Sequence, residues 1–166
     1  MLVKEIMNKP AVTCPVDSTL DVAARLMAEF DCGIIPVIGD DGRLAGVVTD
    51  RDICMAAYAQ ERPLSKIPVP KAMTRHVIAS HMNDAIETVE HLMADNRIRR
   101  VPVVDDHGRP LGVVSVNDVV RLAAKSHRIG IDRELVETLA AICQPKAAPG
   151  QTPRQPTRPE KLVIRG

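Results

Sequence analysis

The apolar positions near the start of the chain follow two spacings, and each predicts a different element. Residues at three- and four-residue intervals predict a helix that Ser18 or Thr19 can cap. The apolar face of this helix is expected to contain Leu20, Ala23, Met27 and Phe30. Two β-branched runs, 34–38 and 44–49, follow on either side of a turn rich in glycine and aspartate, a pattern typical of a hairpin. A second helix is expected over 50–59.

The same order of elements recurs 66 residues later, when Met7 is placed over Met73 and both copies are followed without a gap. The identities in this register include 26–28 with 92–94, 36–37 with 102–103, 42–43 with 108–109, 46–48 with 112–114 and Asp52 with Asp118. Each copy also begins with a short apolar run, 11–13 or 77–79, that predicts a strand. In the second copy Asn83 or Asp84 precedes the helical stripe of Ile86, Val89, Leu92 and Met93.

These patterns predict an α+β fold built from two tandem βαββα repeats. One such unit would leave too much apolar surface exposed, so the two are expected to pack sheet to sheet. The expected boundaries are repeat 1 at 1–62, a linker at 63–70, repeat 2 at 71–126, a C-terminal helix at 127–143 and a disordered tail at 144–166. The linker contains three prolines, and the helix has apolar residues at helical spacing. The tail is Pro-rich, with five basic residues against one acidic.

The amino-acid composition argues against several classes of function. The chain has one Phe, one Tyr and no Trp, so it lacks the stacking aromatics of single-strand binding proteins, and nucleic acid is an unlikely partner. No apolar run approaches the roughly eighteen residues of a membrane span, and the N-terminus is charged where a signal peptide would be apolar. We therefore expect a cytoplasmic protein that does not enter membranes.

Cysteine and histidine spacing gives little support for a metal centre or for catalysis. The four cysteines lack any C-x-x-C spacing, so buried reduced thiols are the default expectation, with a disulfide from Cys14 as the alternative. A metal site at His76 and His81 is the weaker interpretation, because scattered histidines are usually surface residues. No hydrolase, metalloprotease or P-loop motif is present. No metal, no cofactor and no enzymatic activity are expected.

Each hairpin ends in a hydroxyl residue followed three positions later by a carboxylate: Thr49 with Asp52, and Ser115 with Asp118. As structure, this is a capping box at a helix start. As function, the free amides of that helix start suit a phosphate, and the carboxylate suits the hydroxyls of a ribose. The run Ile98-Arg99-Arg100-Val101-Pro102 adds two guanidinium groups and favours the functional interpretation.

The T-D-R-D and S-V-N-D elements, the I-R-R-V-P run and the 66-residue repeat together resemble the CBS-domain pair, or Bateman module, over about 2–124. The chain is also similar to small bacterial stand-alone members that are induced by hypoxia or stress. The resemblance implies two adenine-nucleotide clefts, each combining the hydroxyl and carboxylate of one repeat with strand residues of the other. Cleft 1 would contain Thr49, Asp52, Ile78, Ala79, Ile98, Arg99 and Arg100. Cleft 2 would contain Val12, Thr13, Cys32, Gly33, Ile34, Ser115 and Asp118.

The implied function is regulatory sensing of AMP, ADP or ATP, signalled by a change of conformation or oligomeric state. Cleft 1 is expected to bind more tightly, because the strand that faces cleft 2 carries no charge at Cys32, Gly33 and Ile34. The module is expected to form a homodimer through its helices and to regulate a protein partner. The alternative is a stress-response interaction scaffold that has no nucleotide ligand.

Overall fold

The computed structural model describes residues 1–125, 133–143 and 163–165. Its α-helices are α1 Leu20–Glu29, α2 Asp50–Gln60, α3 Ile86–Asn96, α4 Val116–Lys125 and α5 Arg133–Cys143. Its short 3-10 helices are η1 Val3–Glu5, η2 Leu64–Lys66 and η3 Val69–Lys71. Its strands are β1 Cys14–Pro15, β2 Ile34–Ile38, β3 Leu44–Thr49, β4 His76–Ile78, β5 Ser80–His81, β6 Arg100–Val104, β7 Pro110–Ser115 and β8 Val163–Arg165.

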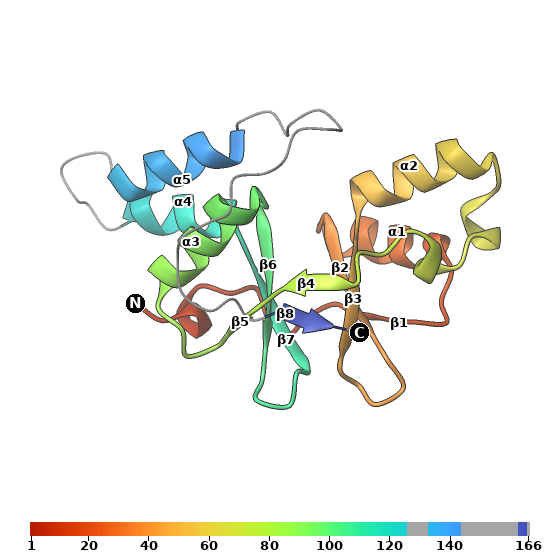
Figure 1. The fold of residues 1–166 in the computed structure, drawn as a ribbon, viewed down its shortest axis with the longest axis horizontal. Helices are drawn as coiled ribbons and strands as arrows, with labels where there is room; N and C mark the ends of the chain where they lie inside the picture. Colours follow the sequence, from red (N-terminus) through yellow and green to blue (C-terminus); the bar gives the residue numbers. More distant parts are fainter. Residues whose placement is uncertain (126–132, 144–162, 166) are drawn as a thin grey trace.

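The two repeats form two equivalent three-stranded sheets, ordered β1-β2-β3 and β5-β6-β7. In each sheet the first strand is parallel to the second, and the last two strands are the predicted antiparallel hairpin. Figure 1 shows these sheets side by side at the centre, with α1 and α2 beside one and α3, α4 and α5 beside the other. The α+β fold with two packed repeats is therefore confirmed.

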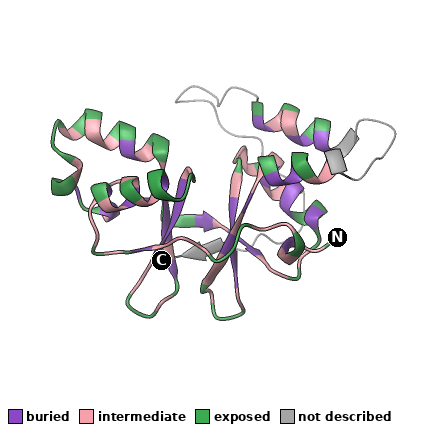
Figure 2. Ribbon diagram, turned by 180° about the vertical axis from the view of Figure 1, so that it is seen from behind, coloured by how far each residue is buried: buried purple, intermediate pink, exposed green. Residues whose placement is uncertain are grey.

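A shared apolar cluster joins the two repeats, in addition to the core that each repeat builds with its helices. It contains Ile34, Leu44, Val47, Val77, Ala79 and Val104, which come from both halves of the chain. The backbone N–H of Leu44 also donates to the Gly108 carbonyl across the interface, at 2.9 Å. Buried positions accordingly follow the central strands, whereas the outer helix faces are exposed (Figure 2).

The segment before each repeat packs on the other repeat. Val3 is fully buried in the core of repeat 2, and the Asn8 amide donates to the Val113 carbonyl at 2.9 Å. In the matching place, Ile67 and Val69 are fully buried in the core of repeat 1. In the structure, residues 3–8 therefore pack with repeat 2, and Ile67 and Val69, in the predicted linker at 63–70, pack with repeat 1.

Two equivalent glycines allow these exchanged segments to cross the hairpins closely. A Cβ on Gly46 would lie 2.9 Å from the Met73 sulfur and 3.0 Å from the Thr74 carbonyl oxygen. A Cβ on Gly112 would lie 2.6 Å from the Asn8 carbonyl oxygen. Any larger residue would push the crossing backbone away from the sheet, so glycine at both positions fixes how the two repeats join.

Several local expectations need correction. Phe30 ends α1 as its C-cap and is 52% exposed, so it does not belong to the buried stripe. The first strands of the two sheets lie at Cys14–Pro15 and Ser80–His81 rather than at 11–13 and 77–79, and His76–Ile78 forms the separate strand β4. The predicted C-terminal helix is present as α5, which packs on α3 and buries Leu135 and Ile142 in the core of repeat 2.

The tail differs from its expected disorder at three residues. Val163–Arg165 form strand β8, which runs antiparallel to β4 and pairs Ile78 with Val163. The other residues of 144–166, and 126–132 before α5, lie outside the described part of the chain. A C-terminal segment is thus attached to the centre of the molecule, next to the strand that leads into repeat 2.

Candidate functional site

The hydroxyl and carboxylate pairs form the predicted caps at both helix starts. The Thr49 side chain accepts from the Asp52 amide at 3.3 Å, while Asp52 Oδ2 accepts from the Thr49 amide at 2.9 Å. The Ser115 amide and hydroxyl donate to Asp118 Oδ2 at 2.7 and 2.5 Å. These contacts stabilise the starts of α2 and α4, and they hold the two carboxylates in equivalent positions.

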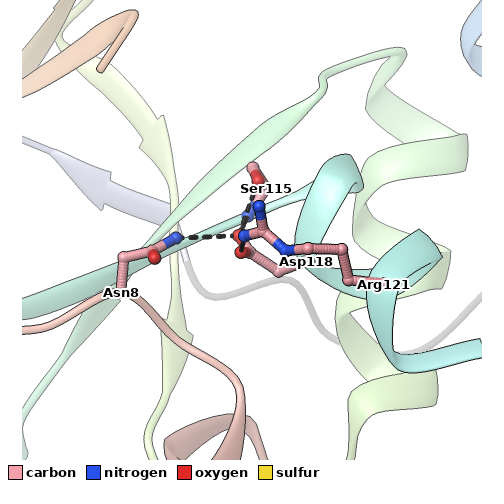
Figure 3. Close-up of polar contacts among 4 residues, drawn as sticks. All are labelled: Asn8, Ser115, Asp118 and Arg121. Atoms are coloured by element: carbon pink, nitrogen blue, oxygen red, sulfur yellow. Dashed lines mark hydrogen bonds and ion pairs between the residues drawn. The ribbon is translucent and has the colours of Figure 1, made fainter. Parts of the chain in front are cut away.

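The two carboxylates differ in their further partners. Asp118 is 5% exposed and also accepts from Asn8 Nδ2 at 2.9 Å, while its Oδ1 receives Arg121 (Figure 3). Asp52 is half-buried, and in the described part of the chain its recorded hydrogen bonds all go to Thr49. Oδ1 of Asp52 therefore makes no recorded hydrogen bond within the described residues, whereas both oxygens of Asp118 are engaged.

A cavity of about 580 Å³ lies between the repeats at the position expected for cleft 2. Its lining residues are Asn8, Lys9, Pro10, Ala11, Val12, Phe30, Asp31, Cys32, Gly33, Ile34, Arg100, Val113, Ser115, Asn117 and Arg121. Five of the seven predicted cleft 2 residues are among them. The other two are Thr13, which follows a lining residue in sequence, and Asp118, which binds the lining residues Asn8, Ser115 and Arg121.

The cavity is basic, contrary to the expectation that cleft 2 would be poor in charge. Its wall includes Lys9, Arg100 and Arg121 against Asp31 alone. Arg100 was assigned to cleft 1, but the sheet register pairs it with Ser115, at the start of α4. Its guanidinium reaches over Gly33, where a Cβ would lie only 2.6 Å from Arg100 Nη2.

Burial raises the pKa of the Cys32 thiol in the cavity wall, and the opposing effects of the Ile34 backbone hydrogen bond and of the Arg100 charge are smaller. Burial also raises the pKa of Cys14, to about 11. All four cysteines are free. The alternative disulfide from Cys14 is therefore absent, while the expectation of burial is wrong for Cys54 and Cys143, which are exposed.

The residues expected in cleft 1 are dispersed around the matching position in the other half of the molecule. Thr49 and Asp52 begin α2, and Arg99 is exposed just before β6. Ala79 is fully buried in the shared cluster, and Ile98 packs half-buried against the core of repeat 2. The remaining residue, Ile78, is the last of β4 and is paired with β8. Among the seven residues, only Arg100 is in the wall of the described cavity.

Several lining residues were not predicted from the sequence, although it contains a signal for some of them. Arg121 is three positions after Asp118 in a helix, and residues three apart share a helix face. Asn117 is inside the S-V-N-D element itself. Asn8 to Ala11 line the cavity because the segment before repeat 1 packs against repeat 2. The residue pattern within a single repeat does not indicate this packing.

Comparison with known proteins agrees with this architecture. The family model described as "CBS domain" matches residues 3–59 and 65–125, which together make up more than half of the chain. The chain belongs to the CBS-domain family. It has two CBS repeats, as the resemblance in its sequence implied.

Relatives of similar length include Hypoxic response protein 1 of Mycobacterium tuberculosis. It is 32% identical over 145 residues, which is 87% of this chain and 95% of that protein. The L-aspartate semialdehyde sulfurtransferase of Methanocaldococcus jannaschii is also 32% identical, over 73% of this chain, but the match spans only 23% of that enzyme. The similarity to this enzyme therefore involves only part of the enzyme's own sequence.

Two solved structures connect the fold to ligands. The CBS domain pair of protein MJ0100, in complex with 5'-methylthioadenosine and S-adenosyl-L-methionine, has a TM-score of 0.69 at 32% identity, covering 76% of this chain and 98% of that one. Hypoxic Response Protein I with two coordinated zinc ions has a TM-score of 0.66 at 30% identity, covering 73% and 98%. Within 1–125, 133–143 and 163–165, no three His, Cys, Asp or Glu residues gather as metal ligands.

The helices of the described residues include none with the length and apolar character needed to cross a membrane. The longest of them, α2, α3 and α5, have 11 residues each. This agrees with the sequence, which contains no apolar run of spanning length.

Proposed function

We propose that this CBS pair is a regulatory module that binds an adenosine-containing ligand between its repeats, with AMP, ADP or ATP as the ligand class. The observation that carries the proposal is the basic cavity of cleft 2, whose wall is drawn from both repeats. Its volume of about 580 Å³ is within the range of about 300 to 1,000 Å³ for small-molecule sites. A ligand bound there would contact both repeats, so binding would couple to their relative position.

The chemistry of the wall suits a nucleotide. Ser115 and Asn117 bring the start of α4 to the cavity, and the free amides and dipole of a helix start favour anions. Arg100 is half-buried and makes no recorded hydrogen bond or ion pair within the described residues, so its guanidinium is available to a phosphate. Apolar residues Val12, Ile34 and Val113 provide surface for a purine ring.

A calorimetric titration with AMP, ADP, ATP, NADH and S-adenosylmethionine tests the proposal. Wild type should bind at least one adenine nucleotide, and Arg100→Ala should weaken binding by about ten-fold or more, because a charge-assisted contact contributes about 1.5 to 3 kcal/mol. The control is Arg99→Ala, which removes the neighbouring guanidinium from an exposed position outside the cavity wall. Equal affinity in the two variants would contradict the assignment of Arg100 to cleft 2.

The interaction-scaffold alternative predicts a different result. If no adenine nucleotide produces heat or a thermal shift at millimolar concentration, the sensing proposal fails. The capping boxes would then have only a structural role, and a protein partner would be the remaining hypothesis. In the measured complex of MJ0100 both ligands contain adenosine, which supports the sensing proposal over the scaffold.

We also propose that two copies associate through their helices to form a homodimer. Three large apolar side chains are exposed on α2 and α4: Met55 at 52%, Tyr58 at 79% and Val120 at 40%. Apolar side chains that face water in one copy are typical of surfaces that pair isologously in a dimer. Sedimentation at micromolar concentration should show a dimer, and a monomer would contradict the proposal.

A further inference from the structure

The environment of β4 differs from that of the equivalent segment in repeat 1. In the 66-residue register, His76, Val77 and Ile78 correspond to Pro10, Ala11 and Val12. These last three line the open cavity of cleft 2. Their counterparts in repeat 2 are the three residues that pair with β8. The C-terminal strand β8 therefore pairs with the segment whose counterpart lines cleft 2, and Figure 1 shows β8 beside β4.

The position of β8 also affects the other elements of cleft 1. Besides pairing with β4, it contacts β3, whose last residue is Thr49. It thus lies against the two strands that supply Ile78 and Thr49 to the predicted cleft. The pairing of Ile78 with Val163 places a tail residue beside the backbone of a residue that is expected in cleft 1.

In repeat 1 the equivalent backbone is bonded differently. The amide of Ala11 donates to the Leu111 carbonyl of β7 at 3.0 Å, which attaches the cavity wall directly to the neighbouring hairpin. The corresponding residues by the repeat are Val77 and Ala45, and the described backbone bonds between the repeats do not include this pair. Val77 instead pairs with Ile164 of β8. The tail strand thus takes the place of a contact that the other repeat makes within the body.

We propose that β8 is an internal competitor for cleft 1: the C-terminal strand and an adenosine-containing ligand exclude each other there, so cleft 1 opens only when β8 separates from β4. This rests on the proposed function, since it requires the inter-repeat clefts to bind such ligands. A competitor on the same chain acts at an effective concentration that is set by the connecting chain and does not depend on the protein concentration. Ligands would therefore fill cleft 2 first, and cleft 1 would respond to whatever displaces the tail.

The experiment compares two full-length variants, Ile164→Pro and Ile164→Val. Proline lacks the backbone N–H and has a fixed φ, so it opposes strand pairing, whereas valine keeps a β-branched residue. Hydrogen exchange at the amides of His76–Ile78 should become faster in Ile164→Pro and stay unchanged in Ile164→Val. Unchanged protection in Ile164→Pro and in a second variant, Val163→Pro, would overturn the pairing.

Calorimetry with AMP and ATP then tests the competition. Ile164→Pro should bind a second ligand per chain, and adding Asp52→Ala to it should remove that second ligand. If about one tenth of the molecules have an open cleft 1, freeing it raises the apparent affinity by about ten-fold. The same stoichiometry and affinity in Ile164→Pro, Ile164→Val and wild type would overturn the inference alone. Binding by none of the three overturns the proposed function and the competition with it.

Discussion

The two clefts are built from equivalent elements of the two repeats, but their surroundings differ. In cleft 2 the carboxylate is saturated: Asp118 receives Ser115, Asn8 and Arg121, and the open cavity beside it is lined by Arg100. In cleft 1 the carboxylate of Asp52 keeps one oxygen without a recorded partner, but the adjoining strand is paired with β8. Cleft 2 thus has a cavity with positive charge in its wall, whereas in cleft 1 Oδ1 of Asp52 has no recorded hydrogen bond within the described residues. Near-identical motifs therefore do not imply equal binding.

This comparison reverses the expected order of affinity. The sequence suggested that cleft 1 would bind more tightly because Arg99 and Arg100 start its strand. The register instead puts Arg100 beside Ser115, and its side chain lines the cavity of cleft 2. We now expect cleft 2 to be filled first.

The largest effect is expected from filling the space over Gly33. Gly33→Leu should weaken nucleotide binding in cleft 2 by about a hundred-fold, because it displaces Arg100 and also takes up cavity volume, and each ten-fold corresponds to about 1.4 kcal/mol. Gly33 does not have a positive φ, and the atoms nearest to a Cβ there are side-chain ends of Arg100 and Asp50, so the fold should tolerate the change. Calorimetric titration measures the loss.

The matched control for this variant is Arg99→Leu, which puts the same side chain at the equivalent position of repeat 2. Because Arg99 is exposed and is not part of the cavity wall, binding in cleft 2 should change little. A similar loss of affinity in both variants would contradict the asymmetry. Thermal melts without ligand should show both proteins folded.

An intermediate effect is expected on stability when the two carboxylates are removed in turn. Asp118→Ala removes a buried carboxylate that accepts from the half-buried Ser115 and the exposed Asn8, and losing these hydrogen bonds to a charged group costs about 1.5 to 3 kcal/mol. Asp52→Ala loses mainly a helix cap, which is worth about 1 kcal/mol. At about 2 to 4 °C per kcal/mol for a chain of this size, Asp118→Ala should have the lower melting temperature. A lower melting temperature for Asp52→Ala would show that the contacts of Asp118 with Asn8 and Arg121 add nothing to the stability of the fold.

The smallest effect concerns the thiol in the wall of cleft 2. Because burial raises the pKa of Cys32, its thiolate fraction is small at neutral pH, so alkylation should be slow there and accelerate as the pH rises. A ligand bound in cleft 2 should slow alkylation further, by about a few-fold, because it would shield the half-buried Cys32 thiol. Mass spectrometry of alkylated peptides measures the rate, and exposed Cys54 is the internal control. Equal slowing at Cys54 would mean that the effect is not local to the cleft.

The order of the elements could be predicted because it depends on local patterns. Helical spacing located α1 and α3, and the turns at 39–42 and 105–108 located the hairpins. The partners of those elements depend on the folded chain. No periodicity indicates that Val3 packs with Ile86, or that the tail contributes a strand beside His76.

In the candidate site, too, local sequence patterns predicted the motif residues but not their partners from the other repeat. The motif residues Ser115 and Asp118 were predicted because a hydroxyl and a carboxylate three residues apart have a fixed geometry at a helix start. The direction of Arg100 could not be predicted, since either face of the strand was open to its long side chain. In the structure the Arg100 guanidinium lies over Gly33 of the other repeat, where the absence of a side chain leaves room for it.

The exchange of segments between the repeats has a consequence for how the chain is made. During synthesis repeat 1 can complete its own core once Ile67, Val69 and Met73 have emerged. Val3 must wait for core partners such as Ile86 and Val101, which follow much later in the chain. Contacts between distant parts of a sequence form slowly, and apolar segments without partners are prone to associate. Residues 3–8 are therefore among the last parts of the two repeats to pack, and a nascent chain that ends early in repeat 2 exposes Val3 without its core partners.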